Sequence, residues 1–130
     1  MKNILLIVLF CFFVISCSKD GSEINTSIVG EWSWIKSSGG LAGITYTPEN
    51  TGEIRKLVIS SDSMKYFSND NLIMKLEYKI KTVDMHNESR EMIIRESDDT
   101  FRQFFEINQD ELILTDYCDD CFVNEYKRSK

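Results

Sequence analysis

The sequence predicts an all-β protein, a small eight-stranded antiparallel up-and-down barrel that follows an N-terminal leader. Short apolar–polar alternations recur from residue 28 to the end of the sequence, and no long stretch has the 3.6-residue period of a helix. Turn residues separate the alternating segments. An antiparallel meander of this size avoids exposed edge strands most easily by closing into a barrel.

The first sixteen residues have the composition of a signal peptide. Lys2 precedes an apolar run over residues 4–15, which is shorter than the roughly 20 residues that a membrane-spanning helix needs. The run ends in Val-Ile-Ser-Cys at residues 14–17, which resembles the lipobox cut by the lipoprotein signal peptidase. We therefore expect cleavage before Cys17 and its modification with diacylglycerol and further acyl chains such as palmitate, because one chain alone anchors weakly. An ordinary secretory peptide is the alternative.

The chain is thus expected to have three parts: the signal peptide (1–16), the lipidated cysteine with a small, polar, flexible tether (17–27), and the barrel domain (28–130). Ser18 follows the anchor in place of the Asp that retains many lipoproteins in the inner membrane. We expect a location in the cell envelope, at the outer membrane, on either its periplasmic or its surface face. A net charge of −6 argues against nucleic acid as a partner.

The barrel domain contains eight segments that alternate in the manner of strands. They are residues 29–35, 55–61, 63–69, 72–81, 91–96, 101–107, 112–114 and 122–128. The clearest is 72–81, in which apolar residues alternate with lysine and glutamate, so that one face is apolar and the other charged.

Residues 37–52 form the one long connector, and they are rich in glycine and threonine. Connectors of this length in a compact domain usually have a function or fold on themselves. Because Leu41, Ala42, Ile44 and Tyr46 are apolar, we expect an ordered flap that packs over one mouth of the barrel, with a strand-like piece near residues 44–47.

Residues 28–130 resemble the lipocalin-like lipoproteins common in Bacteroidota, which have calycin-type barrels. Gly30-Glu31-Trp32 resembles the Gly-x-Trp signature of lipocalins, and Arg128 stands where they keep an arginine that packs over that tryptophan. The resemblance implies that Trp32 and Arg128 close one end of the barrel; a guanidinium over an indole gains roughly 0.5–2 kcal/mol. The chain departs from the larger lipocalins in its short length and in having no helix after the last strand, and these departures put a large internal cavity in doubt.

Two cysteines remain in the domain, Cys118 and Cys121. In an oxidising envelope we expect them to form a disulfide, with free thiols and a metal site as alternatives. A zinc site needs four ligands, and the single His86 is far away in the sequence. We expect no metal and no cofactor.

Ordinary catalytic equipment is missing from the sequence: there is no Ser-His-Asp arrangement, phosphate-binding loop or paired metal motif, so we expect a non-catalytic protein. The aromatic residues are the remaining signal. Trp34, Tyr46, Tyr66 and Tyr78 are the candidates for lining a ligand pocket, although a small barrel also needs aromatic side chains to fill its core.

Two functions follow. The first is a membrane-anchored binding protein that holds a small hydrophobic ligand in the barrel mouth. The second is an interaction or inhibitor module of the envelope, with a filled barrel and an exposed apolar patch near residues 39–52 that contacts a protein partner.

Overall fold

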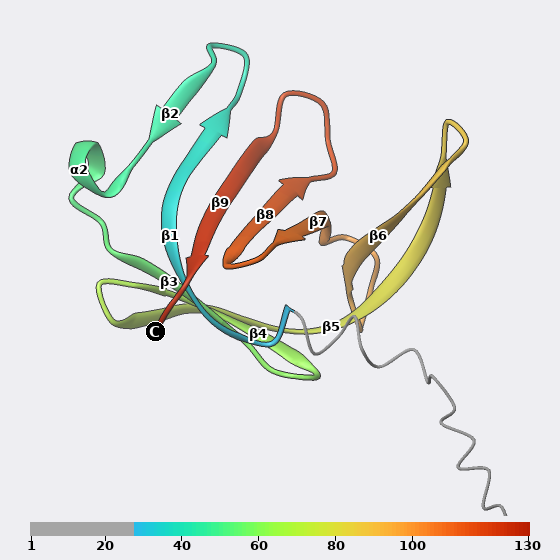
Figure 1. Ribbon diagram of the computed structural model, residues 1–130, viewed down its shortest axis with the longest axis horizontal. Helices are drawn as coiled ribbons and strands as arrows, with labels where there is room; N and C mark the ends of the chain where they lie inside the picture. Colours follow the sequence, from blue (N-terminus) through green and yellow to red (C-terminus); the bar gives the residue numbers. More distant parts are fainter. Residues whose placement is uncertain (1–27) are drawn as a thin grey trace, which may run out of the picture.

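The computed structural model describes residues 28–130; the leader, Cys17 and the tether lie outside the described residues. The described chain contains nine strands and one helical turn (Figure 1). They are β1 (Gly30–Gly39), β2 (Ile44–Tyr46), α2 (Pro48–Thr51), β3 (Arg55–Ile59), β4 (Ser63–Ser68), β5 (Asn71–Met85), β6 (Glu88–Arg95), β7 (Arg102–Asn108), β8 (Glu111–Asp116) and β9 (Phe122–Arg128). No helix among residues 28–130 is long and apolar enough to cross a membrane.

The strands form a closed antiparallel barrel. From β3 to β9 each strand pairs with the next along the chain, β1 pairs with β3, and pairing of β1 with β9 closes the ring. The short β2 pairs only with the C-terminal part of β1 and branches from the rim, so eight strands make the wall. The prediction of an all-β, eight-stranded barrel is confirmed. Residues 28–130 contain the whole barrel and its buried core, so this segment has what a domain needs to fold on its own.

A β-bulge in β1 determines which of its side chains enter the barrel. The register with β9 shifts between Trp34 and Lys36. Ile35 follows the regular alternation and is exposed, and the extra residue then reverses the alternation, so that Ser37 is buried in place of Lys36. The same strand ends at Gly39, where a Cβ would collide with the backbone carbonyl of Cys121; the missing side chain therefore allows β1 and β9 to approach closely.

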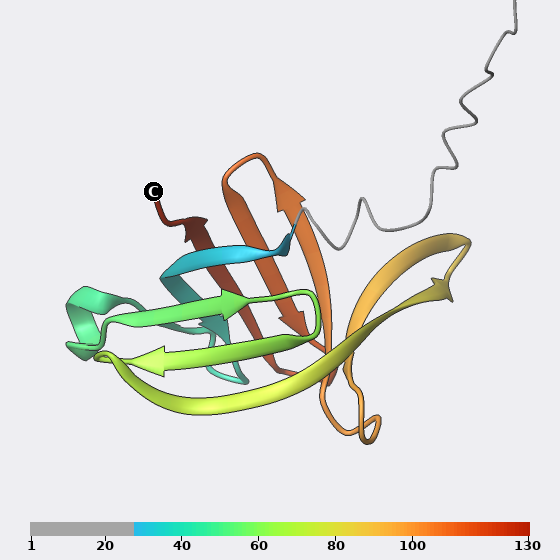
Figure 2. The ribbon, with the colours of Figure 1, turned by 90° about the horizontal axis from the view of Figure 1, so that it is seen from below.

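The hairpin between β5 and β6 is longer than the sequence indicates. The expected strands covered 72–81 and 91–96, whereas pairing continues to Met85 and Glu88 across the two residues His86 and Asn87, both with positive φ. Most of the added residues are polar, so the apolar–polar alternation that predicts a strand does not extend over them. The hairpin projects beyond the barrel wall (Figures 1 and 2).

The flap differs from the expectation. The strand-like piece near residues 44–47 is β2, and it is followed by α2, which begins with a capping box between Thr47 and Asn50. The flap does not pack its apolar residues over the barrel mouth: Leu41 is 91% exposed, Ile44 46% and Tyr46 37%. β2 instead extends the sheet beyond the rim, where few side chains are available to cover it.

The core lies mainly inside the barrel. Its buried side chains include Trp32, Leu57, Ile59, Met64, Ile93, Leu112 and Leu114. A second, smaller cluster of Met92, Ile94 and Phe104 lies on the opposite face of β6 and β7, because these residues alternate with inward-facing Ile93 and Gln103.

Candidate ligand cavity at the open end of the barrel

One end of the barrel is sealed. The Cζ atom of Arg128 lies 4.1 Å from the centroid of the Trp32 ring, and the structure thus brings together the pair that the resemblance implies. Trp32 is fully buried, and its indole N–H donates to the carbonyl of Ile28 at 2.8 Å. Arg128 donates to the carbonyl of Val29 at 3.1 Å. Both side chains therefore tie the start of β1 across this end.

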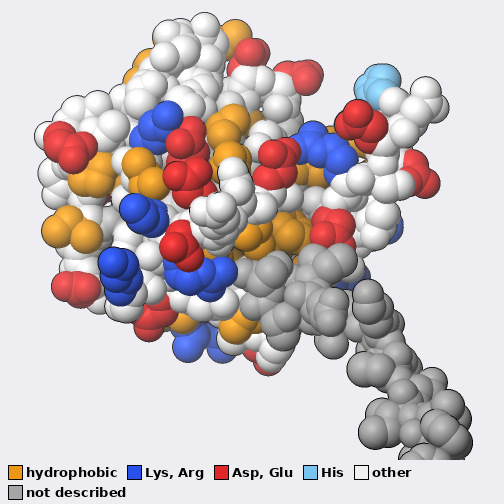
Figure 3. All heavy atoms as spheres, in the orientation of Figure 1, with side chains coloured by type: hydrophobic (Ala, Val, Ile, Leu, Met, Phe, Trp, Pro, Cys, Tyr) orange, Lys and Arg blue, Asp and Glu red, His pale blue; other side chains and the backbone are white. Residues whose placement is uncertain are grey.

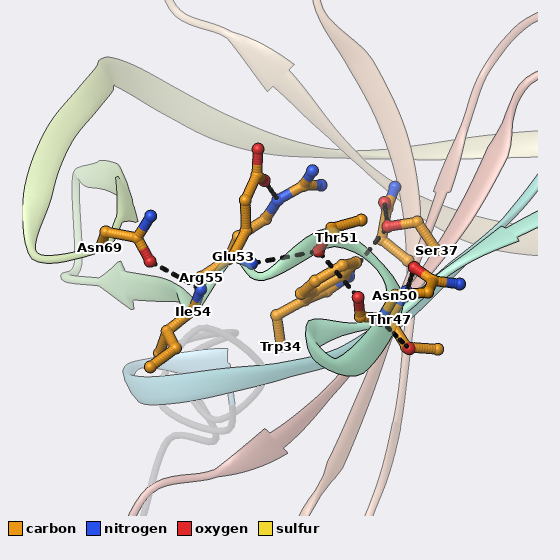
Figure 4. Close-up of polar contacts among 10 residues, drawn as sticks. Trp34, Ser37, Thr47, Asn50, Thr51, Glu53, Ile54, Arg55 and Asn69 are labelled. Atoms are coloured by element: carbon orange, nitrogen blue, oxygen red, sulfur yellow. Dashed lines mark hydrogen bonds and ion pairs between the residues drawn. The ribbon is translucent and has the colours of Figure 1, made fainter.

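The opposite end carries a second arginine–tryptophan pair, Arg55 with Trp34, which was not predicted from the sequence. The Cζ atom of Arg55, at the start of β3, lies 4.3 Å from the centroid of the Trp34 ring. Its Nε also donates to the Glu53 carboxylate at 2.6 Å, as Figure 4 shows beside the α2 turn. The charge of Arg55 is therefore balanced within the protein.

A cavity of about 520 Å³ opens at this end. Its lining combines apolar and aromatic side chains with polar and charged ones. The lining residues are Glu53, Arg55, Lys56, Tyr66, Phe67, Ser68, Ile73, Met74, Phe101, Gln103, Asp116, Asn124 and Tyr126. None of residues 37–52 is among them, so the flap does not close this cavity.

The four predicted ligand-binding candidates are divided between different places. Tyr66 lines the cavity, and Trp34 lies beside it beneath Arg55. Tyr46, on the flap, packs against Phe122 of β9, with ring centroids 5.8 Å apart. Tyr78 is buried and donates to the carbonyl of Ser60 at 2.8 Å, in the β3–β4 turn. Tyr46 and Tyr78 thus lie outside the cavity.

A chain of hydrogen bonds connects Trp34 to the cavity wall. Its indole N–H donates to the Ser37 hydroxyl at 2.9 Å, and this hydroxyl donates to the Asn124 side-chain oxygen at 2.6 Å. The bulge in β1 makes this possible, because it turns Ser37 inward. The amide of Asn124 is thereby held in one orientation at the cavity surface.

A second chain of hydrogen bonds crosses the barrel interior from β4 to β7 and continues to the neighbouring β8. The Tyr66 hydroxyl donates to Gln103 Oε1 at 3.3 Å, and Gln103 Nε2 donates to Asp116 Oδ1 at 2.6 Å. Gln103 is buried, and both of its polar atoms have partners. The network fixes the position of the Asp116 carboxylate at the end of β8.

Burial raises the pKa values of three side chains at this end of the barrel, Asp116, Tyr66 and Tyr126. It raises the pKa of the Asp116 carboxyl, an effect that the hydrogen bonds from Gln103 and the backbone of Phe122 oppose. Burial also raises the pKa values of Tyr66 and Tyr126, which keeps both phenols neutral at ordinary pH. None of the ion pairs found within residues 28–130 involves Asp116.

Arg55, Gln103, Asn124 and the role of Asp116 were not found from the sequence. Periodicity contained a usable signal, because each lies two residues from a side chain that faces the interior: Leu57, Phe105, Tyr126 and Leu114. A polar residue at an inward position of a strand is costly unless it is hydrogen-bonded, so such positions indicate a cavity or a network.

Cys118 and Cys121 are joined by a disulfide in the loop between β8 and β9, with Cα atoms 5.5 Å apart. His86 lies in the turn of the projecting β5–β6 hairpin. Among the described residues, no group of three or more His, Cys, Asp or Glu side chains is placed to hold a metal ion. Acidic and basic side chains are mixed on the face shown in Figure 3, without a basic patch.

No protein-family model matches the sequence, and no curated protein matches it. Among solved structures, the chain is similar to a mutant of the fluorescent protein UnaG, with 15% sequence identity, a match covering 81% of this chain and 98% of that chain, and a TM-score of 0.42.

Proposed function

We propose that the protein is a lipid-anchored, non-catalytic binding protein of the bacterial envelope, and that its barrel holds a small, largely apolar ligand at the open end. The observation that carries this proposal is the contrast between a sealed end and an end with a cavity of about 520 Å³. Pockets of roughly 300–1,000 Å³ that combine an apolar lining with a few fixed polar groups are typical of small-molecule sites.

The lining matches that pattern. Met74, Phe101 and Ile73 supply apolar surface, and Tyr66 and Tyr126 add aromatic rings with polar hydroxyls. Asn124 and Gln103 are held by hydrogen bonds, so their positions are set before a ligand arrives. The proposed ligand is therefore an apolar body with at least one polar group.

Native mass spectrometry tests the ligand. Residues 18–130, exported and purified without detergent, are expected to carry a small molecule that is lost in Met74→Trp, because the larger indole occupies part of the cavity and obstructs the ligand. Ile35→Trp, on the outer face of β1, is the matched control and is expected to keep the molecule. Absence of any bound molecule, together with no uptake of added apolar compounds, would contradict the proposal.

The proposed anchor rests on the lipobox-like sequence before Cys17. The change Cys17→Ala is expected to abolish incorporation of labelled acyl chains and to release the protein from membranes or stall its processing. Normal cleavage and continued membrane attachment of Cys17→Ala would show that the anchor lies elsewhere.

The exposed apolar side chains of the flap support a second candidate function, a protein-interaction module. Leu41, Ile44 and Tyr46 are exposed on a segment that does not close the cavity. A photo-crosslinker at position 41 is then expected to give one discrete adduct in cells that a crosslinker at position 86, on the distant hairpin, does not give. Identical patterns from both positions would count against this function.

A further inference from the structure

We propose that the ligand of the open-end cavity carries a positively charged amine, and that the Asp116 carboxylate binds it. This inference rests on the proposed function and names the chemical class of the ligand's polar group. The reason is that the charged groups lining the cavity differ in whether an opposite charge balances them.

The positive charges of the cavity are already compensated or lie at its edge. Arg55 is paired with Glu53 at 2.6 Å and stacks on Trp34. The ammonium group of Lys56 lies 5.2 Å from the centroid of the Phe67 ring, and these two residues are cross-strand neighbours on the outer face of β3 and β4. Glu53 therefore offsets the charge of Arg55 and weakens its attraction for an anionic ligand.

Asp116 is different, because it has no cationic partner within residues 28–130. It accepts hydrogen bonds from the Gln103 side chain and the Phe122 backbone. A carboxylate has about four lone-pair sites, so two such donors leave capacity for an ammonium group. A half-buried carboxylate without a counter-ion is costly, and a cation that enters the cavity removes that cost.

The neighbouring groups favour an amine attached to an apolar body. The rings of Tyr66, Phe101 and Tyr126 line the cavity with Asp116, and aromatic faces attract cations as well as apolar chains. The orientation of Asp116 is set by Gln103, which is itself held by Tyr66, so the acceptor is positioned before binding.

Three ligands with the same chain length separate the contribution of the polar group from that of the apolar chain. They are octylammonium, octanoate and 1-octanol. Their affinities for residues 18–130 are measured by isothermal titration calorimetry at neutral pH. We expect octylammonium to bind at least about tenfold more tightly than octanoate, because the ammonium group donates to the oppositely charged Asp116 carboxylate, which repels the octanoate carboxylate. We expect 1-octanol to lie between the two.

The variant Asp116→Asn keeps an oxygen for the bond from Gln103 but removes the charge. It is expected to weaken octylammonium binding about tenfold and to change 1-octanol binding by less than about twofold. Asp110→Asn, at the sealed end, is the matched control for loss of one negative charge and is expected to leave all three affinities unchanged.

The outcomes distinguish the two proposals. Binding of 1-octanol or octanoate without a preference for octylammonium would overturn the amine assignment and leave the binding function standing. A preference for octylammonium that survives Asp116→Asn would also overturn it. If none of the three binds, while the variants remain folded by circular dichroism, both the amine and the apolar-ligand function are contradicted.

Discussion

The barrel has an arginine stacked on a tryptophan at each end, and the two pairs have nearly equal geometry but different surroundings. Arg128 lies 4.1 Å from the Trp32 ring centroid, and Arg55 lies 4.3 Å from that of Trp34. At the sealed end both partners donate to backbone carbonyls just before β1, those of Ile28 and Val29. At the open end both partners bond to side chains, Ser37 and Glu53, near the cavity.

The difference shows that the same contact serves two purposes. Bonds to the backbone fix the chain where β1 begins, so the sealed pair contributes to stability. Bonds to side chains position Asn124 and balance the charge of Arg55, so the open pair shapes the wall of a cavity. We therefore expect substitutions at the sealed end to affect folding, and substitutions at the open end to affect binding more than folding.

The largest expected effect compares two apolar truncations of similar size. Leu112, at the sealed end, is fully buried, and Leu112→Ala is expected to lower the free energy of unfolding by about 2–5 kcal/mol because it leaves an empty cavity. Met74 borders the open cavity, so Met74→Ala is expected to cost less than about 2 kcal/mol, since water can occupy the added space. Urea denaturation of residues 18–130 measures both; equal losses would remove the distinction between the ends.

The next largest expected effect on the free energy of unfolding comes from replacing the two arginines. Arg128→Met is expected to lower the free energy of unfolding by about 1–2 kcal/mol, because it removes the cation–π contact and the hydrogen bond to Val29. Arg55→Met is expected to cost less than about 1 kcal/mol, since its cation–π contact with Trp34 borders the open cavity and its ion pair with Glu53 is about a third exposed and well screened. Thermal and urea denaturation check the order, and a larger loss for Arg55→Met would contradict it.

The sequence contained more information about the sealed end than about the open one. Strand alternation and turn residues were enough for the barrel, because burial of one face imposes a two-residue period. The Gly-x-Trp motif and Arg128 indicated the closing pair. The open end depends on contacts between residues far apart in the sequence, such as Tyr66 with Gln103, and on one bulge that turns Ser37 inward. Local patterns do not encode such a shift in register.

The flap shows a further limit of sequence patterns. Its apolar side chains were expected to be covered, on the rule that apolar residues avoid water, yet Leu41 and Ile44 are exposed. The rule holds only on average, because more than half of a folded protein's surface is apolar. Whether an apolar residue is buried depends on what the fold places opposite it, and Leu41 at the tip of the β1–β2 hairpin is left 91% exposed.

The smallest expected effect concerns the pH dependence of stability through Asp116. Burial raises its pKa in the folded protein above the ordinary value of 3.8, so the native state holds the proton more tightly than the unfolded state. Stability from this group is fully present below 3.8 and is lost as the pH rises through the folded pKa. Asp116→Asn has no such loss. It is expected to be more stable than the wild type at neutral pH, by an amount that shrinks toward acid.

The difference between the two proteins isolates Asp116. Asp62 and Asp98 have lowered pKa values, mainly through hydrogen bonds to Ser60 and Thr100, so they act in the opposite direction, but they do so equally in both proteins. Urea denaturation from pH 3 to pH 8 therefore gives a difference curve that rises through the folded pKa of Asp116. A flat curve would show that the carboxylate pays no desolvation cost in the empty cavity, and it would remove the physical reason for an amine to bind there.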